Sequence, residues 1–214
     1  MININTLNGG TITITSETPG PAGHPETRIT FSDGSSDTYE WSGEIDQQTM
    51  VDAGLYDDNE WTWIKQPVTV DIGNSVTNIG QEAFNICDTL TSVTIPNSVT
   101  NIGSSAFYNC SGLMNVTISN SVKSIGYLAF GFCSGLTNVT IPDSVMSIGE
   151  RAFRVCDGLT SVTIGNGVTN IGPSAFSDCT SLTSVTFLGK TLEQVQAMDN
   201  YPWGIEDTSI ISVA

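Results

Sequence analysis

The chain has 214 residues, of which 39% are hydrophobic, and six basic against 22 acidic side chains give it a net charge of −16. This length and apolar fraction suit a folded protein with a sizeable core. The negative charge repels phosphate backbones and therefore excludes nucleic acid as an expected partner. No apolar run approaches the roughly 18 residues of a membrane span, and the segment after Met1 lacks the basic and apolar regions of a secretory signal. We therefore expect no membrane insertion.

Residues 1–65 predict a β-rich capping region. A first hairpin is centred on the turn Asn8-Gly9-Gly10, and a second joins segments 28–31 and 38–41 through the turn 32–37. The alternating apolar positions of the first hairpin are Ile2, Ile4, Ile12 and Ile14. The region is also the most acidic part of the chain, with 11 acidic and two basic side chains.

A short helix is predicted to follow these hairpins. Asp46 is placed to cap a helix over 47–53, which Gly54 would end. Three bulky residues come after it, and we expect them to pack onto the first repeat: Trp61, Trp63 and Ile64.

Residues 66–187 repeat every 23 residues in five units. Ile-Gly, Ala-Phe, Cys, Leu, Val and Ile recur in phase, and no unit could bury these side chains alone, so the units must stack. Val93 and Ile95 alternate with polar neighbours, as in a strand with one buried face. We expect a second extended piece over 76–79, after which Gly80 lets the backbone turn into one helical or 3₁₀ turn that carries Ala83 and Phe84.

This pattern resembles the BspA-like family of leucine-rich repeats, whose units carry L-x-x-I-x-I-P, S-V-x-x-I-G and A-F-x-x-C. The resemblance implies an α/β-type, right-handed curved leucine-rich-repeat solenoid with a parallel β-sheet on its concave face. It also implies attachment to surfaces and binding of protein or glycan, and it brings no catalytic residues.

Residues 188–214 predict a C-terminal cap. Thr191 and Gln194 form a capping-box signature that opens a helix through about residue 198. The apolar stripe of this helix would be Leu192, Val195 and Met198. The segment 201–204 is expected to lie over the last coil, and the stretch 189–204 resembles the closing segment of BspA-like chains from gut bacteria and their phages.

Five cysteines in register invite a metal or disulfide interpretation. Their positions are Cys87, Cys110, Cys133, Cys156 and Cys179. Zinc needs converging ligands, whereas parallel coils place equivalent residues in a row about 4.8 Å apart. A buried ladder is the simpler prediction, and no metal or cofactor is expected. Asp33, Ser35 and Asp37 match half of a calcium loop, but a hairpin turn already explains them.

Enzymatic function is not expected. The single histidine, His24, lies in a Gly/Pro-rich loop with no partnered nucleophile nearby in sequence. The chain also lacks the phosphate-binding and zinc-protease motifs. Glycoside cleavage by a pair of carboxylates is an alternative that the sequence leaves open, although the repeats supply few acidic residues.

The predicted binding surface is the outward side of the concave sheet, where hydroxyls and amides present neutral donors and acceptors on a rigid frame. Its residues are Ser92, Thr94, Asn115, Thr117, Asn138, Thr140, Ser161, Thr163, Ser184 and Thr186. The competing interpretation is purely structural, because threonine is a good exposed strand residue.

Two functions follow from these patterns. The first is a recognition or adhesion module that binds a protein or glycan through the solenoid surface, in an extracellular, cell-surface or virion-associated setting. The alternative is a structural component of a phage tail or surface layer that docks into a larger assembly through residues 1–65. Ice binding by the threonine rows is a third possibility, which curvature and the Ser/Asn alternation disfavour.

Overall fold

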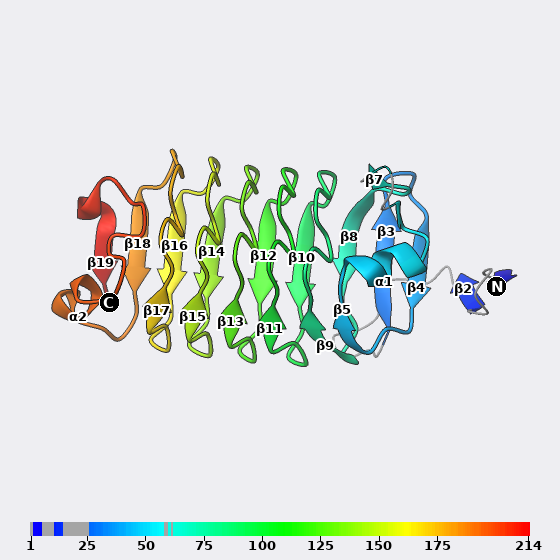
Figure 1. Cartoon of the computed structure of the whole chain (residues 1–214), viewed down its shortest axis with the longest axis horizontal. Helices are drawn as coiled ribbons and strands as arrows, with labels where there is room; N and C mark the ends of the chain where they lie inside the picture. The colour runs from blue at the N-terminus through cyan, green and yellow to red at the C-terminus, as the bar shows by residue number, and fades with distance from the viewer. Residues whose placement is uncertain (1, 6–10, 15–25, 58–59, 61) are drawn as a thin grey trace.

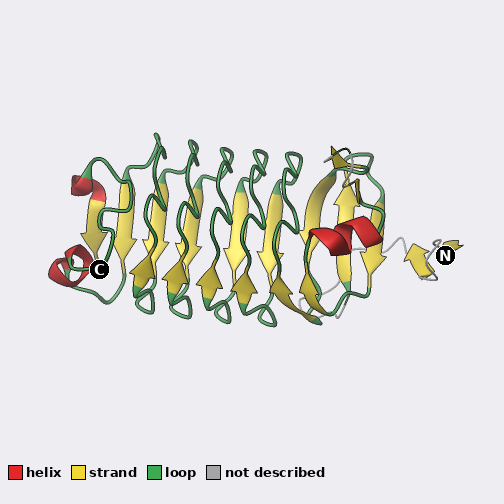
Figure 2. Ribbon diagram, in the orientation of Figure 1, coloured by secondary structure: helices red, strands yellow, loops and turns green. Residues whose placement is uncertain are grey.

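The computed structural model describes residues 2–5, 11–14, 26–57, 60 and 62–214, and it shows stacked coils with a cap at each end (Figure 1). Each coil has two strands and one turn segment, and helices occur only in the caps (Figure 2). The predicted solenoid with a parallel sheet is confirmed.

The longer strands line one side of the solenoid, which we call the long-strand face. They are β8 (Pro67–Asp71), β10 (Ser92–Ile95), β12 (Asn115–Ile118), β14 (Asn138–Ile141), β16 (Ser161–Ile164) and β18 (Ser184–Phe187). Val93 and Ile95 are buried while Thr94 is exposed, as the period-2 pattern predicts. Val70 of β8 pairs with Val93, 23 residues later, so β8 belongs to a further coil that lacks the complete motif.

The shorter strands line a second side, the short-strand face. They are β9 (Val76–Ile79), β11 (Asn101–Ile102), β13 (Ser124–Ile125), β15 (Ser147–Ile148) and β17 (Asn170–Ile171). Every neighbouring pair is parallel, and each residue pairs with the one 23 positions later, as Ile102 does with Ile125. The inward isoleucines are almost completely buried.

The third side is a turn layer, and here the prediction of a helical or 3₁₀ turn is wrong. Glu82 and Ile86 have left-handed backbone, with φ of 58° and 55°, and no residue between them has a positive φ. This alternation points the N–H groups of Glu82, Phe84 and Ile86 at the next coil, where they donate to the carbonyls of residues 104, 106 and 108 at 2.7–3.0 Å. A helix would have kept these bonds within its own coil. Hydrogen bonds therefore join the coils on this side too.

The core is built from in-register ladders. Phe84, Phe107, Phe130, Phe153 and Phe176 stack at 5.2–5.5 Å between ring centroids. The predicted cysteine ladder runs beside them, and four of its five members are buried. From Cys110 to Cys179, each thiol donates at 3.0–3.1 Å to the carbonyl of a phenylalanine 26 residues earlier. A small apolar side chain with one weak donor fits this position.

The N-terminal cap closes both sheets. Its elements are β1 (Ile2–Asn5), β2 (Thr11–Ile14), β3 (Thr27–Phe31), β4 (Ser36–Tyr39), β5 (Gly43–Ile45), α1 (Gln47–Asp52), β6 (Tyr56–Asp57) and β7 (Thr62–Trp63). Both predicted hairpins are present, as antiparallel pairs β1–β2 and β3–β4. β3 then pairs antiparallel with β8, and β5 pairs with β9. Asp46 caps α1 as predicted.

The three bulky residues after α1 only partly follow the prediction. The Trp63 ring stacks on Phe84 with centroids 6.4 Å apart, and its Nε1 donates to the carbonyl of Asn85 at 2.8 Å. Ile64 is 60% exposed, so its predicted packing onto the first repeat is wrong. Trp61 lies outside the described residues.

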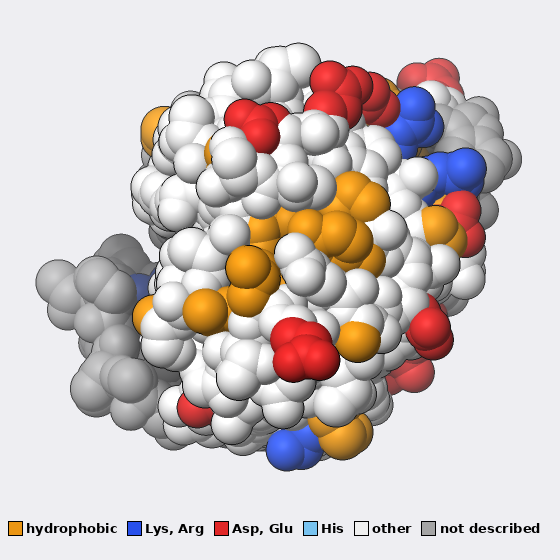
Figure 3. Space-filling model, turned by 90° about the vertical axis from the view of Figure 1, so that its left-hand side faces the viewer, with side chains coloured by type: hydrophobic (Ala, Val, Ile, Leu, Met, Phe, Trp, Pro, Cys, Tyr) orange, Lys and Arg blue, Asp and Glu red, His pale blue; other side chains and the backbone are white. Residues whose placement is uncertain are grey.

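The C-terminal cap contains α2 (Leu192–Gln196), the 3₁₀ helix η1 (Thr208–Ile210) and β19 (Ile211–Val213). Thr191 and Gln194 form the predicted capping box, and the fully buried Trp203 lies against Phe187 at 5.5 Å. The helix ends earlier than predicted, and Leu192 is exposed rather than packed. The sequence did not predict β19, which adds a strand beside β18. Apolar side chains gather across the middle of this end face (Figure 3).

Candidate functional site

The long-strand face presents all ten predicted site residues outward, and none of them is buried. They form two rows in which equivalent side chains lie one coil apart. The first row is Ser92, Asn115, Asn138, Ser161 and Ser184, and the second, the threonine row, is Thr94, Thr117, Thr140, Thr163 and Thr186.

Most side chains of the two rows make no hydrogen bond to a residue that the structure describes. In the first row, Asn138 Oδ1 accepts hydrogen bonds from the hydroxyls of Thr160 and Ser161. In the threonine row, Thr186 bonds to Ser212 in β19 at 3.0 Å. The other hydroxyls of this row make no hydrogen bond to any residue that the structure describes, and they belong to Thr94, Thr117, Thr140 and Thr163. These hydroxyls are therefore available to a ligand.

A flanking row of threonines has a structural role instead. The hydroxyls of Thr91, Thr160 and Thr183 each donate to a backbone carbonyl 23 residues earlier, at 3.0–3.2 Å. Met114 occupies the same position in the second unit, where its side chain is 48% exposed. The structural interpretation therefore explains Thr91, Thr160 and Thr183. It explains neither Thr137, whose hydroxyl accepts from Asn138 Nδ2 at 3.2 Å, nor the free hydroxyls of the threonine row.

The sheet of the long-strand face is interrupted between β12 and β14, a break we call the seam. β12 ends one sheet and β14 begins another, although they are neighbours in the stack. Val116 of β12 is only half-buried, whereas Val93 and Val139 at the same position are buried. A hollow of about 450 Å³ opens here. Its lining includes Thr117, Asn120, Asn138, Thr140, Pro142 and Leu188.

Pro142 gives a chemical reason for part of this interruption. At the equivalent position of the next two coils, the N–H groups of Gly165 and Leu188 donate to the preceding coil at 2.8 and 2.9 Å. Proline has no N–H and cannot make this bond. Sequence reasoning used Pro142 only to end a strand and missed the seam. Pro96 follows β10 in the same way while β10 still pairs with β8, so proline alone does not open a sheet.

The remaining chemical candidates are structural. Burial raises the pKa of the Cys110 thiol, and of the Cys87 thiol, so neither is a thiolate at neutral pH. Asp33 accepts two hydrogen bonds from Ser35, which lower the pKa of its carboxyl, as in a hairpin turn. In the part of the chain that the structure describes, no group of three or more metal-ligating side chains converges. His24 lies outside that part.

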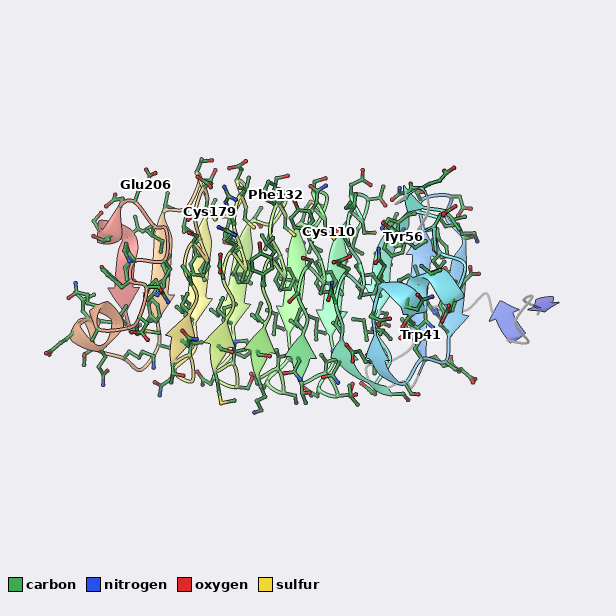
Figure 4. The ribbon with its side chains drawn as sticks, viewed as in Figure 1. Trp41, Tyr56, Cys110, Phe132, Cys179 and Glu206 are labelled. Atoms are coloured by element: carbon green, nitrogen blue, oxygen red, sulfur yellow. The ribbon has the colours of Figure 1, made fainter. Side chains whose placement is uncertain are left out.

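The thiols differ in accessibility, and we expect alkylation to show it. Cys179 lies in the last complete unit, toward the C-terminal end of the stack (Figure 4). It is only partly buried, whereas Cys110 is completely buried. Iodoacetamide should therefore modify Cys179 alone in the folded protein at neutral pH, as followed by mass spectrometry, and modify Cys110 only after unfolding. The Cys179→Ser variant should show no modification while folded. Labelling of Cys110 at the rate of Cys179 would contradict the buried ladder.

No helix among the described residues is long and apolar enough to cross a bilayer.

No protein of curated function matches the chain significantly. Several solved structures, however, match the chain significantly. A leucine-rich cell surface protein from Faecalibacterium prausnitzii A2-165 is 33% identical, with a TM-score of 0.59 over 62% of this chain and 35% of that one. A Bacteroides ovatus leucine-rich repeat protein is 30% identical, with a TM-score of 0.54 over 65% of this chain and 37% of that one.

A T. pallidum leucine-rich repeat protein is 25% identical, with a TM-score of 0.58 over 80% of this chain and 71% of that one. The chain thus spans only about a third of the length of the first two proteins. The family model for the BspA type leucine-rich repeat region matches residues 64–183 in six copies. This is one copy more than the complete motifs predict, in agreement with the additional coil that contains β8. The chain belongs to the BspA type leucine-rich repeat family.

Proposed function

We propose that this protein is a non-enzymatic recognition module that binds a protein or glycan through its long-strand face. The observation that carries this proposal is the threonine row, whose free hydroxyls stand on a stack that hydrogen bonds join on three sides, except at the seam. Such a frame presents donors and acceptors with little loss of conformational entropy on binding. Its fold relative in F. prausnitzii is described as a cell surface protein, which supports a role at a cell surface. Adhesion there is the finer part of this proposal.

The test is a triple substitution in the threonine row. Thr117→Arg, Thr140→Arg and Thr163→Arg together place three bulky cations over the surface, and they should abolish binding while the protein stays folded. Binding is measured on an array of matrix proteins and of host and bacterial glycans. Folding is checked by circular dichroism and a thermal melt.

A matched control places the same three cations on the short-strand face. Thr100, Met146 and Thr169 are exposed there at one equivalent position of three repeats, and Lys123 occupies this position in the repeat between the first two. Their triple substitution by arginine changes the net charge equally and should leave binding intact. If both triple variants bind as well as the wild type, the long-strand face is not the receptor.

The alternative is an assembly role through residues 1–65. It is supported by the acidity of this region and by the β1–β2 hairpin, which forms a sheet with no third strand among the described residues. A two-stranded sheet alone is marginally stable, so a partner that adds to it would contribute stability. Absence of binding by the wild-type chain on the whole array favours this alternative.

A further inference from the structure

The seam is a local opening between two coils that are otherwise tightly joined. On the turn side, the N–H of Phe107 donates to Ala129 at 2.8 Å, and the rings of Phe107 and Phe130 stack at 5.2 Å. On the short-strand face, β13 and β15 are paired in register. The coils thus separate only along the long-strand face. The opening is a feature of that face and does not reflect a loosely packed core.

The seam exposes hydrogen-bonding groups that other coils use among themselves. β12 pairs with β10 and β14 pairs with β16 over all four residues, but the facing edges of β12 and β14 are unpaired. Backbone N–H and C=O groups at such edges need a partner, either water or a ligand. The hydroxyls of Thr117 and Thr140 stand on opposite sides of the same opening, and both line the hollow. Backbone and side-chain groups therefore converge there.

The lining indicates the chemistry of the occupant. Thr117, Asn120, Asn138 and Thr140 are neutral donors and acceptors, while Pro142 and Leu188 supply apolar surface. The lining also has one charged side chain, Asp143, whose Oδ1 accepts from the backbone N–H of Asn166 at 2.7 Å. A volume of about 450 Å³ lies within the range of small-molecule sites. The net charge of −16 disfavours anionic ligands. These properties suit a neutral, hydroxyl-rich ligand with apolar C–H faces.

A peptide strand fits the seam poorly. Neighbouring strands lie about 4.8 Å apart, so a strand inserted between β12 and β14 would need them roughly 9.6 Å apart. Cα atoms of β12 and β14 approach within 8 Å of each other. The opening accommodates hydroxyl groups that bridge its two edges, but not a further backbone.

We propose that the seam is a subsite for a neutral oligosaccharide, whose hydroxyls bond to Thr117, Thr140 and the open edges of β12 and β14. This inference rests on the proposed recognition function and makes it specific: the saccharide binds at one interruption of the threonine row rather than along all of it.

The first experiment compares two identical side-chain changes. Thr94 and Thr140 are both exposed members of the threonine row, and neither hydroxyl bonds to a described residue, but only Thr140 lines the hollow. Calorimetric titrations use cellohexaose, maltohexaose and chitohexaose up to millimolar concentration. Thr140→Val should weaken binding about tenfold, the effect of one good hydrogen bond. Thr94→Val should change affinity less than about twofold.

The second experiment tests the opening itself. Ser119 occupies the position of Pro142 in the preceding coil, whose strand β12 pairs fully with β10. Pro142→Ser restores an N–H and should weaken saccharide binding. Hydrogen exchange by mass spectrometry should show residues 137–141 exchanging faster than residues 160–164 in the wild-type protein, with the difference reduced in the variant. Equal protection of the two wild-type segments would disprove the seam.

Other outcomes also overturn the inference, without touching the proposed function. Equal losses in Thr94→Val and Thr140→Val would show binding along the whole row. Loss of a protein ligand in the triple arginine variant, with no oligosaccharide bound by the wild type, would leave a recognition module without a saccharide subsite. Binding of extended peptides at Thr140 in place of saccharides would assign the seam to a different class of ligand.

Discussion

Replacing Phe130 by alanine should lower the free energy of unfolding by about 3–5 kcal/mol, the usual cost of removing a buried aromatic side chain from a core. Phe130 is completely buried in the central repeat. Its ring stacks on Phe107 at 5.2 Å and on Phe153 at 5.3 Å, so the substitution removes contacts to two coils at once. Urea unfolding followed by tryptophan fluorescence measures the change.

Phe132 provides a matched control in the same turn. It is the same residue type two positions later, but it is only partly buried, and its ring touches Tyr108 edge-on at 5.3 Å near the surface. Phe132→Ala should therefore cost about 1 kcal/mol or less. If both variants unfold at the same urea concentration, Phe130 does not belong to the continuous core and the inward assignment of the repeat is wrong.

The inward positions could be predicted because each is specified five times. Phe84 and its equivalents cannot be buried within one unit, and the 23-residue period leaves stacking as the way to bury them. The caps were also predictable where a local signal was strong. Asp46 and Thr191 begin helices α1 and α2 through side-chain bonds to the backbone, which depend only on neighbouring residues.

The turn layer could not be predicted from the same sequence. Ile86 and Phe132 have left-handed backbone, which bulky side chains rarely adopt, so their residue types give no indication of it. The conformation is imposed by hydrogen bonds to the next coil, an interaction between residues 22 positions apart. β19 was missed for a similar reason: Ile211–Val213 is too short to identify alone, and it is a strand because β18 offers an edge.

The candidate site was predicted in part. Alternation in the strands correctly placed Thr117 and Thr140 outward, because the side-chain period of a strand is fixed. The sequence could not distinguish the threonines that bond to a carbonyl of the preceding coil, such as Thr160, from those whose hydroxyls are free. Nor could it locate the seam, because Pro96 and Pro142 carry the same signal and only one of them accompanies an open pair of strands.

Gly126→Ala should destabilise the protein by about 3 kcal/mol, at the upper end for overpacked cores, because a single methyl group would meet backbone rather than a movable side chain. A Cβ at Gly126 would lie 2.6 Å from the carbonyl carbon of Gly103 and 2.7 Å from the nitrogen of Ser104. Gly149 meets Gly126 in the same way one coil later. The Ile-Gly motif thus sets how closely coils approach. Thermal and urea unfolding measure the loss.

Gly131→Ala is the control for this effect, five residues away in the same unit. A Cβ there would also meet an atom at 2.6 Å, but that atom is the terminal Cδ2 of Leu128, which a rotation about a side-chain bond can move. Leu128 is only partly buried, so it has room to adjust. We expect Gly131→Ala to change stability by less than about 1 kcal/mol. Equal losses in the two variants would mean that alanine is disfavoured at glycine positions of the coil in general, whereas a loss confined to Gly126→Ala would show that backbone contact between coils requires the Ile-Gly motif.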